Sequence, residues 1–210
     1  MDTKLTGKTR IESDLIGARE IPAEALYGVQ TLRGIENFSI SKFRLSEYPL
    51  FIKGLAITKM AAAMANFELG LLTVEQKDAI IAACGEILDG KHHDQFPVDM
   101  IQGGAGTTTN MNANEVIANR ALELMGHERG EYQYCSPNDH VNCSQSTNDA
   151  YPTAIHIGMY FKHLQLLPHL EELIASFRKK GEEFSQIIKM GRTQLEDAVP
   201  MTLGPVSYTH

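Results

Sequence analysis

Three stretches of the chain concentrate the short hydroxyl and amide side chains that proteins use to hold small anions. They are GGAGTTTNMN at 103–112, QSTND at 145–149 and GRTQLEDAVPMTLG at 191–204. In the second stretch, Ser146, Thr147 and Asn148 stand directly before a long helical pattern. A helix N-terminus leaves backbone N–H groups unpaired and carries a partial positive charge, so neutral donors there would form a seat for a carboxylate. The alternative is that Asn148 or Asp149 only caps the helix.

The other polar stretches also have structural alternatives. Thr107 could cap a following helix, and Thr193 could end the segment before it. The glycines near Thr107 would let backbone approach a ligand closely, but the lysine of a phosphate loop is missing, which disfavours a nucleotide. His92 and His93 are adjacent and therefore point in different directions, and no third histidine lies at useful spacing, so a metal site is disfavoured.

Composition limits the partners of the chain. The 210 residues are 43% hydrophobic, enough to bury a core, and carry a formal net charge of −7. This charge, without any basic block, argues against nucleic acid or an anionic membrane as a partner. An anionic ligand must therefore be held by local dipoles and a few nearby cations. The N-terminus is polar, no apolar stretch approaches the roughly 20 residues that span a bilayer, and the three cysteines lack CxxC spacing, so we expect a cytoplasmic protein.

The elements that must position these groups are predicted to be mainly α-helical. Residues 10–38 mix short apolar pieces with glycine and proline, which predicts a compact irregular segment with one or two short helices. Apolar periodicity then predicts helices over 49–70, over 73–89 after a capping box, from about 112 to 125, and from 151 to about 188. Pro168 should kink or divide the last helix. Its length and its apolar faces imply a bundle or an oligomeric core whose partner helices are missing.

A set of motifs then connects the whole chain to a known family. They are RIESDLIG, YGVQT, ENF, DQFPVD, QGGAGT followed by NMNANEV, PNDHVN, QSTNDAYPT and KMGRTQLEDAVPMTLG. Together, in this order, they resemble the N-terminal part of the aspartase/fumarase superfamily from about Arg10 to Gly204. Class II fumarases usually show Ser-Ser where this chain has Ser146-Thr147, and Gly-Ser-Gly-Thr-Gln where it has GAGTTTN. Gln194, where fumarases carry His, leans the same way, toward the aspartases, although some aspartases also carry His.

The resemblance implies a fold and a domain order. The fold class is mainly α, with a small irregular and helical N-terminal domain followed by the first long helices of a truncated central helical bundle. The expected parts are a flexible tail at 1–9, an N-terminal lyase domain at 10–144, the start of the bundle at 145–204 and a tail outside the family pattern at 205–210.

The resemblance also implies an activity, the reversible anti elimination of ammonia from L-aspartate to give fumarate. It implies no organic cofactor, leaves activation by a divalent cation open, and implies a homotetramer whose sites combine several subunits. The Cβ proton of aspartate is very weakly acidic, so a base can remove it only while fixed donors stabilise the doubly charged aci-carboxylate. By family correspondence, the residues that would grip the substrate carboxylates or amino group are Thr107, Ser146, Thr147, Asn148 and Thr193. Gln194 would add a polar contact.

The chain departs from the family pattern in two places. The family's general base is a serine on a mobile Gly-Ser-Ser loop with a Met-Pro-x-Lys-x-Asn-Pro signature, and these 210 residues do not contain it. After Gly204 the expected Gln-Glu-Phe is replaced by Pro205–His210. We therefore expect a fragment that does not deaminate aspartate by itself. The alternatives are a class II fumarase fragment and a non-catalytic module that binds dicarboxylates or docks onto full-length subunits.

Overall fold

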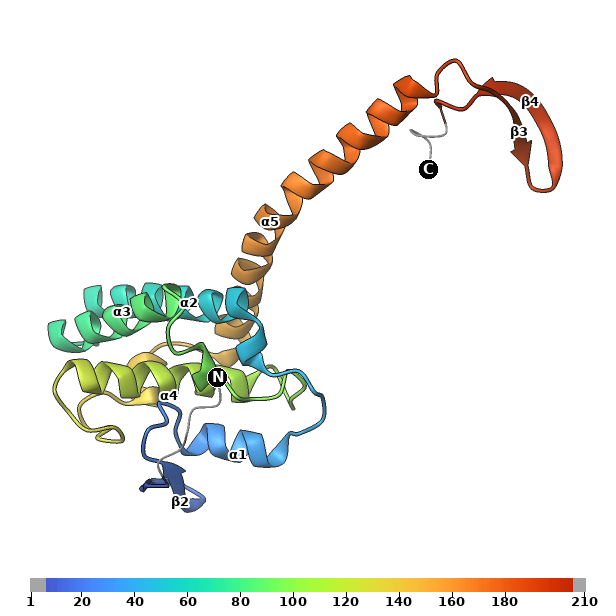
Figure 1. Ribbon diagram of the computed structural model, residues 1–210. Coiled ribbons are helices and arrows are strands. Elements are labelled where there is room, and N and C mark those ends of the chain that lie inside the picture. Colours follow the sequence, from blue (N-terminus) through green and yellow to red (C-terminus); the bar gives the residue numbers. More distant parts are fainter. Residues whose placement is uncertain (1–6, 206–210) are drawn as a thin grey trace. The chain divides into compact units, whose positions relative to one another are not determined.

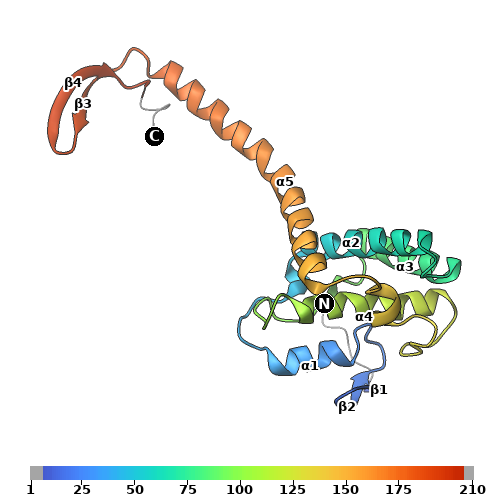
Figure 2. The ribbon, with the colours of Figure 1, turned by 180° about the vertical axis from the view of Figure 1, so that it is seen from behind.

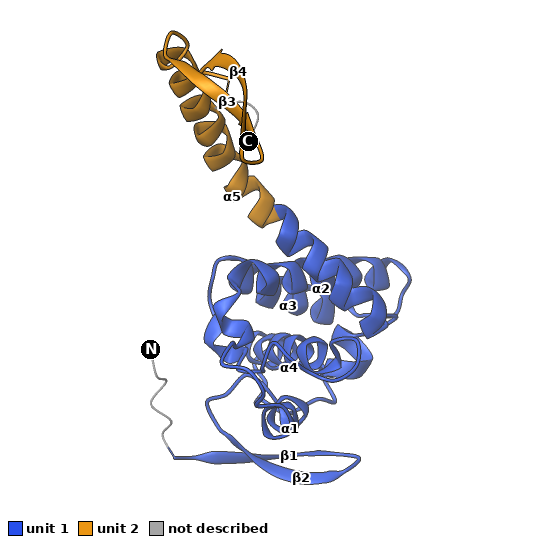
Figure 3. Cartoon of the chain, turned by 90° about the vertical axis from the view of Figure 1, so that its right-hand side faces the viewer, with its two compact units in different colours: residues 1–160 blue, residues 161–210 orange. Residues whose placement is uncertain are grey.

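The computed structural model describes residues 7–205 and is predominantly helical, which confirms the predicted fold class (Figure 1). The expected tails at 1–9 and 205–210 lie largely outside the described residues. The chain forms two compact units, residues 1–160 and 161–210, and helix α5 (Thr147–Glu183) runs from the first into the second (Figure 3).

The N-terminal segment is more regular than predicted. Strands β1 (Thr9–Asp14) and β2 (Gly17–Pro22) form an antiparallel hairpin, and helix α1 (Val29–Asn37) follows. The hairpin was missed because its side chains do not alternate cleanly between apolar and polar faces; Ile11, for example, is 73% exposed. A contact between distant residues fixes it instead, since the Arg33 guanidinium donates to both carboxylate oxygens of Asp14 at 2.7 and 2.9 Å.

Helix α1 begins on two buried carboxylates. Glu115 accepts hydrogen bonds from the backbone N–H groups of Gly28, Gln30 and Thr31 and from the Thr31 hydroxyl, at 2.6–3.0 Å. Glu12 accepts from the backbone N–H of Val29 at 3.1 Å. These side chains satisfy donors that a helix start leaves unpaired. Burial raises the pKa of Glu115, and the four donated hydrogen bonds oppose that rise.

Three long helices form the core of the first unit. Helices α2 (Pro49–Glu68) and α3 (Val74–Leu88) lie side by side over α4 (Thr107–Leu124), and α1 lies beneath α4 (Figures 1 and 2). The predicted capping box of α3 is confirmed, because Thr73 and Gln76 exchange hydrogen bonds. Large side chains of the core include Ile52, Leu55, Ile80, Ile87, Ile117 and Leu122. Short helices η1 (Leu45–Glu47), η2 (His93–Gln95) and η3 (Pro137–Val141) lie in the connections.

Helix α4 begins earlier than predicted, at Thr107 and not near Asn112. Three consecutive threonines have low intrinsic helix propensity, so the sequence pattern hid the first turn. Tertiary contacts supply what propensity lacks. Gly106 precedes the helix with φ of 89°, and the backbone N–H of Thr109 donates to the Gln102 side chain at 2.9 Å.

Helix α2 is long and apolar enough to cross a membrane by length and composition alone, which corrects the expectation that no stretch approaches that length. The structure shows it as a core helix. It packs against α3 and α4, and its buried stripe includes the polar residues Lys59 and Asn66.

The second unit contains the end of α5 and a second hairpin. Helix α5 continues through Pro168, so the proline does not divide it, which was one of the two predicted outcomes. It ends at Glu183, and not near Ile188, and is followed by antiparallel strands β3 (Ile188–Thr193) and β4 (Glu196–Thr202) with an irregularity between Gly191 and Arg192. Several large apolar side chains of α5 in this unit are 38–50% exposed: Leu164, Leu166, Leu167, Leu170, Leu173, Ile174 and Phe177.

Candidate functional site: two adjoining helix starts

The first turns of α4 and α5 adjoin in the first unit. The side-chain amide of Asn110, one turn into α4, donates to the hydroxyl of Thr147 at the start of α5, at 3.1 Å. The turn before α4 also contacts α5, because a Cβ built on Gly106 would lie 2.4 Å from the ring of Tyr151. With φ of 89° and no side chain, Gly106 permits both the turn and the close approach. The structure therefore places Thr107 and residues 146–148 at two neighbouring helix N-termini.

Ser146 caps helix α5. Its hydroxyl oxygen accepts a hydrogen bond from the backbone N–H of Asn148 at 3.2 Å, and its carbonyl accepts from the N–H groups of Asp149 and Ala150. The predicted alternative of a helix cap is thus realised by Ser146, and not by Asn148 or Asp149. A cap that accepts through its oxygen keeps its hydroxyl hydrogen available, so capping does not prevent Ser146 from binding a carboxylate.

The other predicted groups at these helix starts face solvent. Thr107 and Asn148 are exposed, and Thr147 is half-buried. Within residues 7–205, the side chains of Thr107 and Asn148 make no hydrogen bond. These donors are therefore open to a ligand, and the two N-terminal dipoles favour one that is negatively charged.

A buried lysine lies behind the two helix starts, and sequence analysis missed it. The Lys59 ammonium is fully buried and donates to side-chain oxygens of Asn110, Asn142 and Gln145, at 2.7, 3.0 and 2.9 Å. All three acceptors are neutral amides, so no carboxylate among them neutralises the positive charge. Burial lowers the pKa of Lys59 to about 7. A signal was present, because Lys59 falls on the same helical stripe as Ile52 and the other buried residues of α2.

Helix α2 also fixes the loop that leads into α5. Asn66, two turns after Lys59, donates to the carbonyl of Cys143 at 2.9 Å. Gln145 donates back to the carbonyls of Val141 and Cys143, at 2.8 and 3.1 Å. The start of α5 is thus held by buried amides and one buried cation, which give it the rigidity that a preorganised anion-binding site requires.

Thr193 and Gln194 belong to the second unit. Thr193 ends β3, and Gln194 follows in the hairpin turn with φ of 52° and an exposed side chain. Neighbouring Arg192 pairs with Asp197 across the hairpin at 2.9 Å. Neither unit contains all six predicted residues, so the first unit by itself groups only Thr107 and residues 146–148.

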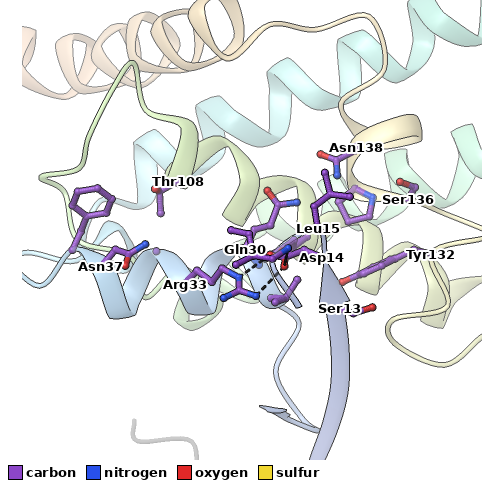
Figure 4. A pocket seen from close by; sticks show the side chains of 16 residues that line it. Ser13, Asp14, Leu15, Gln30, Arg33, Asn37, Thr108, Tyr132, Ser136 and Asn138 are labelled. Atoms are coloured by element: carbon purple, nitrogen blue, oxygen red, sulfur yellow. Dashed lines mark hydrogen bonds and ion pairs between the residues drawn. The ribbon is translucent and has the colours of Figure 1, made fainter. Parts of the chain in front are cut away.

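A cavity of about 810 Å³ in the first unit lies elsewhere, between α1, the β1–β2 turn and η3 (Figure 4). Its one cationic lining residue, Arg33, is engaged by Asp14, and this ion pair lowers the pKa of the Asp14 carboxyl to about 2. Gln30 and Tyr132 contribute further polar groups. This cavity fits a dicarboxylate less well than the two helix starts do. Asp14 already neutralises the Arg33 guanidinium, and none of the predicted site residues lines the cavity.

Comparison with known proteins gives a uniform result. A family model described as "Lyase" matches residues 17–210. Aspartate ammonia-lyases from Pseudomonas canavaninivorans and Escherichia coli (strain K12) are 60% identical over 195 residues and 58% identical over 201 residues, which are 93% and 95% of this chain and 41% and 42% of theirs. The chain therefore spans about two fifths of the length of these relatives.

Two solved structures extend the comparison to the fold. The structure titled fumarate lyase:delta crystallin from Brucella melitensis, bound to cobalt, is 54% identical with a TM-score of 0.92, over 95% of this chain and 44% of that one. A recombinant class II fumarase from Schistosoma mansoni is 38% identical with a TM-score of 0.88, over 96% of this chain and 42% of that one.

Proposed function

This chain belongs to the lyase family, and from that premise we propose that it provides the N-terminal, substrate-binding part of an aspartate ammonia-lyase, which converts L-aspartate reversibly into fumarate and ammonia. The observation that carries the proposal is the pair of adjoining helix starts, which presents unpaired hydroxyl and amide donors in front of a buried cation. The 58–60% identity to aspartate ammonia-lyases supports this substrate over that of the 38% identical fumarase.

The donors at the helix starts suit the difficult step of the reaction. Removal of the Cβ proton places a second negative charge on the neighbouring carboxylate, so groups that hold this charge lower the barrier. Thr107, Ser146 and Thr147 offer short hydroxyls, and Asn148 offers an amide. Lys59 is buried beneath the two helix starts and would contribute a positive electrostatic potential at the ligand without touching it. Because these groups are already in place, little reorganisation is needed as the charge develops.

By family correspondence, Thr193 and Gln194 would add contacts to the ligand from the hairpin of a further copy of the chain. Gln194 has no ionisable proton, so it would provide a hydrogen bond and not acid–base catalysis. We assign no general base to this chain, because the serine-loop signature of the family is not in its sequence. The proposal therefore includes the expectation that the 210 residues alone bind the dicarboxylate but do not deaminate aspartate.

The proposal extends to assembly and location. The exposed apolar residues of α5 support association with further copies. From the family resemblance, we propose that the assembly is a tetramer in the cytoplasm. The same surface supports a second candidate function, a module that docks onto full-length aspartate ammonia-lyase subunits. Sedimentation of the chain with a full-length relative tests this candidate, and two species that sediment independently would contradict it.

Calorimetric titration of the purified chain with fumarate tests the primary proposal. We expect saturable binding by the wild-type chain, weakened in Thr147→Val, and no fumarate formed from aspartate above the buffer blank. Succinate, which has the two carboxylates but a flexible backbone, serves as a comparison ligand, and a monocarboxylate such as propionate serves as the control. Equal affinities for propionate and fumarate would contradict a binding site that is specific for dicarboxylates.

A further inference from the structure

We propose that Asn110 is a positioning residue that directs the hydroxyl hydrogen of Thr147 toward the ligand. The inference rests on the proposed function, because it concerns how the same helix starts hold a carboxylate. Asn110 is 1% exposed, so it does not touch the ligand itself. Its effect passes through Thr147, whose hydroxyl oxygen it contacts at 3.1 Å.

Lys59 and Asn142 fix the orientation of the Asn110 amide. The Asn142 NH₂ group donates to the backbone carbonyl of Gln145 at 3.1 Å, so the Asn142 oxygen faces Asn110 and requires a donor there. The Asn110 atom that lies 2.7 Å from the Lys59 nitrogen is therefore the oxygen. The opposite atom must then be the NH₂ group. An amide rotated by half a turn would place its N–H groups against the ammonium, which is strongly unfavourable for two buried donors.

The two N–H groups of Asn110 have different acceptors. One donates to the side-chain oxygen of Asn142 at 3.0 Å, and the other donates to the Thr147 hydroxyl oxygen at 3.1 Å. The amide nitrogen has no lone pair to offer, so Thr147 can accept from Asn110 but cannot donate to it. Among the residues that the structure describes, the Thr147 hydroxyl donates no hydrogen bond to another group.

The consequence is a hydroxyl whose hydrogen is left for a ligand. The chain of donors runs from Lys59 through Asn110 to Thr147, and each member donates in the same direction. The Thr147 hydroxyl is therefore available to donate to an acceptor, such as a carboxylate oxygen. This arrangement also explains why an asparagine suits position 110, since an aspartate would accept the threonine hydrogen and turn it inward.

A purely structural role is the competing interpretation, in which Asn110 only satisfies Lys59. The variant Asn110→Asp separates the two. It keeps the shape and the oxygen that faces Lys59, but it replaces the N–H donor with an acceptor, so the Thr147 hydroxyl would donate to the new carboxylate. The matched control is Asn142→Asp, which places the same charge beside Lys59 at a side chain that has no contact with Thr147.

Nuclear magnetic resonance of the ligand-free chain tests the hydrogen bond directly. In Thr147→Val, which keeps the shape and removes the oxygen, we expect one Asn110 side-chain amide proton to move upfield and to exchange about tenfold faster, as for the loss of one hydrogen bond. Thr147→Ser keeps the hydroxyl and should leave that proton unchanged. Identical Asn110 resonances in the wild-type chain and Thr147→Val would overturn the proposal.

Titration with fumarate tests the effect on the ligand. We expect Asn110→Asp to raise the Kd about tenfold more than Asn142→Asp, the scale of one hydrogen bond to a charged group. In a Thr147→Val background this difference should vanish. Equal losses in the two aspartate variants, or a difference that persists without the threonine oxygen, would overturn the proposal. If the wild-type chain binds no fumarate, the proposed function fails, and the Asn110 resonances still decide the hydrogen-bond arrangement.

Discussion

The buried ammonium of Lys59 should make the stability of the first unit depend on pH near neutrality. Its pKa is lowered from 10.5 to about 7 by burial, and its side chain is fully buried. Between these values the unfolded chain holds a proton that the folded chain has released. Stability must then rise with pH, by up to about 1.4 kcal/mol for each pH unit.

The useful window is pH 7 to 8.5. Above it the buried thiols of Cys84 and Cys135, whose pKa values burial raises to about 12, act in the opposite direction. From pH 7, where Lys59 is half protonated in the folded chain, to pH 8.5 the linkage predicts a gain of about 1.6 kcal/mol in the free energy of unfolding. The assay is urea denaturation followed by tyrosine fluorescence, because Tyr27 and Tyr132 pack against the core of the first unit.

Lys59→Met is the decisive comparison. It removes the titrating group and leaves three amide oxygens without their donor, so its absolute stability depends on how the site relaxes. Its stability should nevertheless be flat between pH 7 and 8.5. A wild-type protein that gains nothing over this window, or a gain that survives in Lys59→Met, would refute the assignment of a buried, uncompensated cation behind the helix starts.

Three further changes test the surrounding structure. Gly106→Ala should destabilise the chain by about 1–3 kcal/mol, because residue 106 has a φ of 89° and the new Cβ would overlap the ring of Tyr151. Gly70→Ala, at a φ of 74° with no atom near the new Cβ, should destabilise the chain less. Equal losses of stability in thermal unfolding would contradict the close approach of Gly106 to Tyr151. Glu115→Gln should cost about 1–3 kcal/mol in urea, because its NH₂ group would face donors at the start of α1; an unchanged midpoint would show that these hydrogen bonds contribute little. Arg33 lowers the pKa of Asp14 in the folded chain to about 2, from an unfolded value of 3.8. The contribution of this ion pair to the stability is therefore present above pH 3.8 and is lost as the pH falls toward 2. Asp14→Asn should lack this part of the acid sensitivity, and wild-type and variant stabilities that fall in parallel would refute the assignment.

The parts of the fold that the sequence predicted well are those encoded by local signals. Helices α2 and α3 follow an apolar pattern with a proline at the first turn of one and a Thr73–Gln76 box at the start of the other. The start of α4 and both hairpins were missed. Side-chain contacts outside the local helix and strand patterns hold two of these elements. Gln102 accepts from Thr109 at the start of α4, and Arg33 pairs with Asp14 of the first hairpin.

The candidate site divides in the same way. Ser146 and Thr147 were predicted because short polar residues directly before a helical pattern are a local signal. Lys59 was not, because its role depends on amides from two other segments, helix α4 and the loop before α5, that only the fold brings together. Thr193 and Gln194 were predicted from family correspondence, and they lie in the second unit, at the end of β3 and in the turn after it.

Mapping of fumarate onto the chain by amide chemical shifts tests the central claim most directly. With increasing fumarate, we expect saturable shifts at the backbone amides of Thr107, Thr147 and Asn148, with little change around the cavity beneath α1. Chemical-shift changes confined to that cavity, or a spectrum that fumarate does not change, would contradict the proposal that the two adjoining helix starts bind a dicarboxylate.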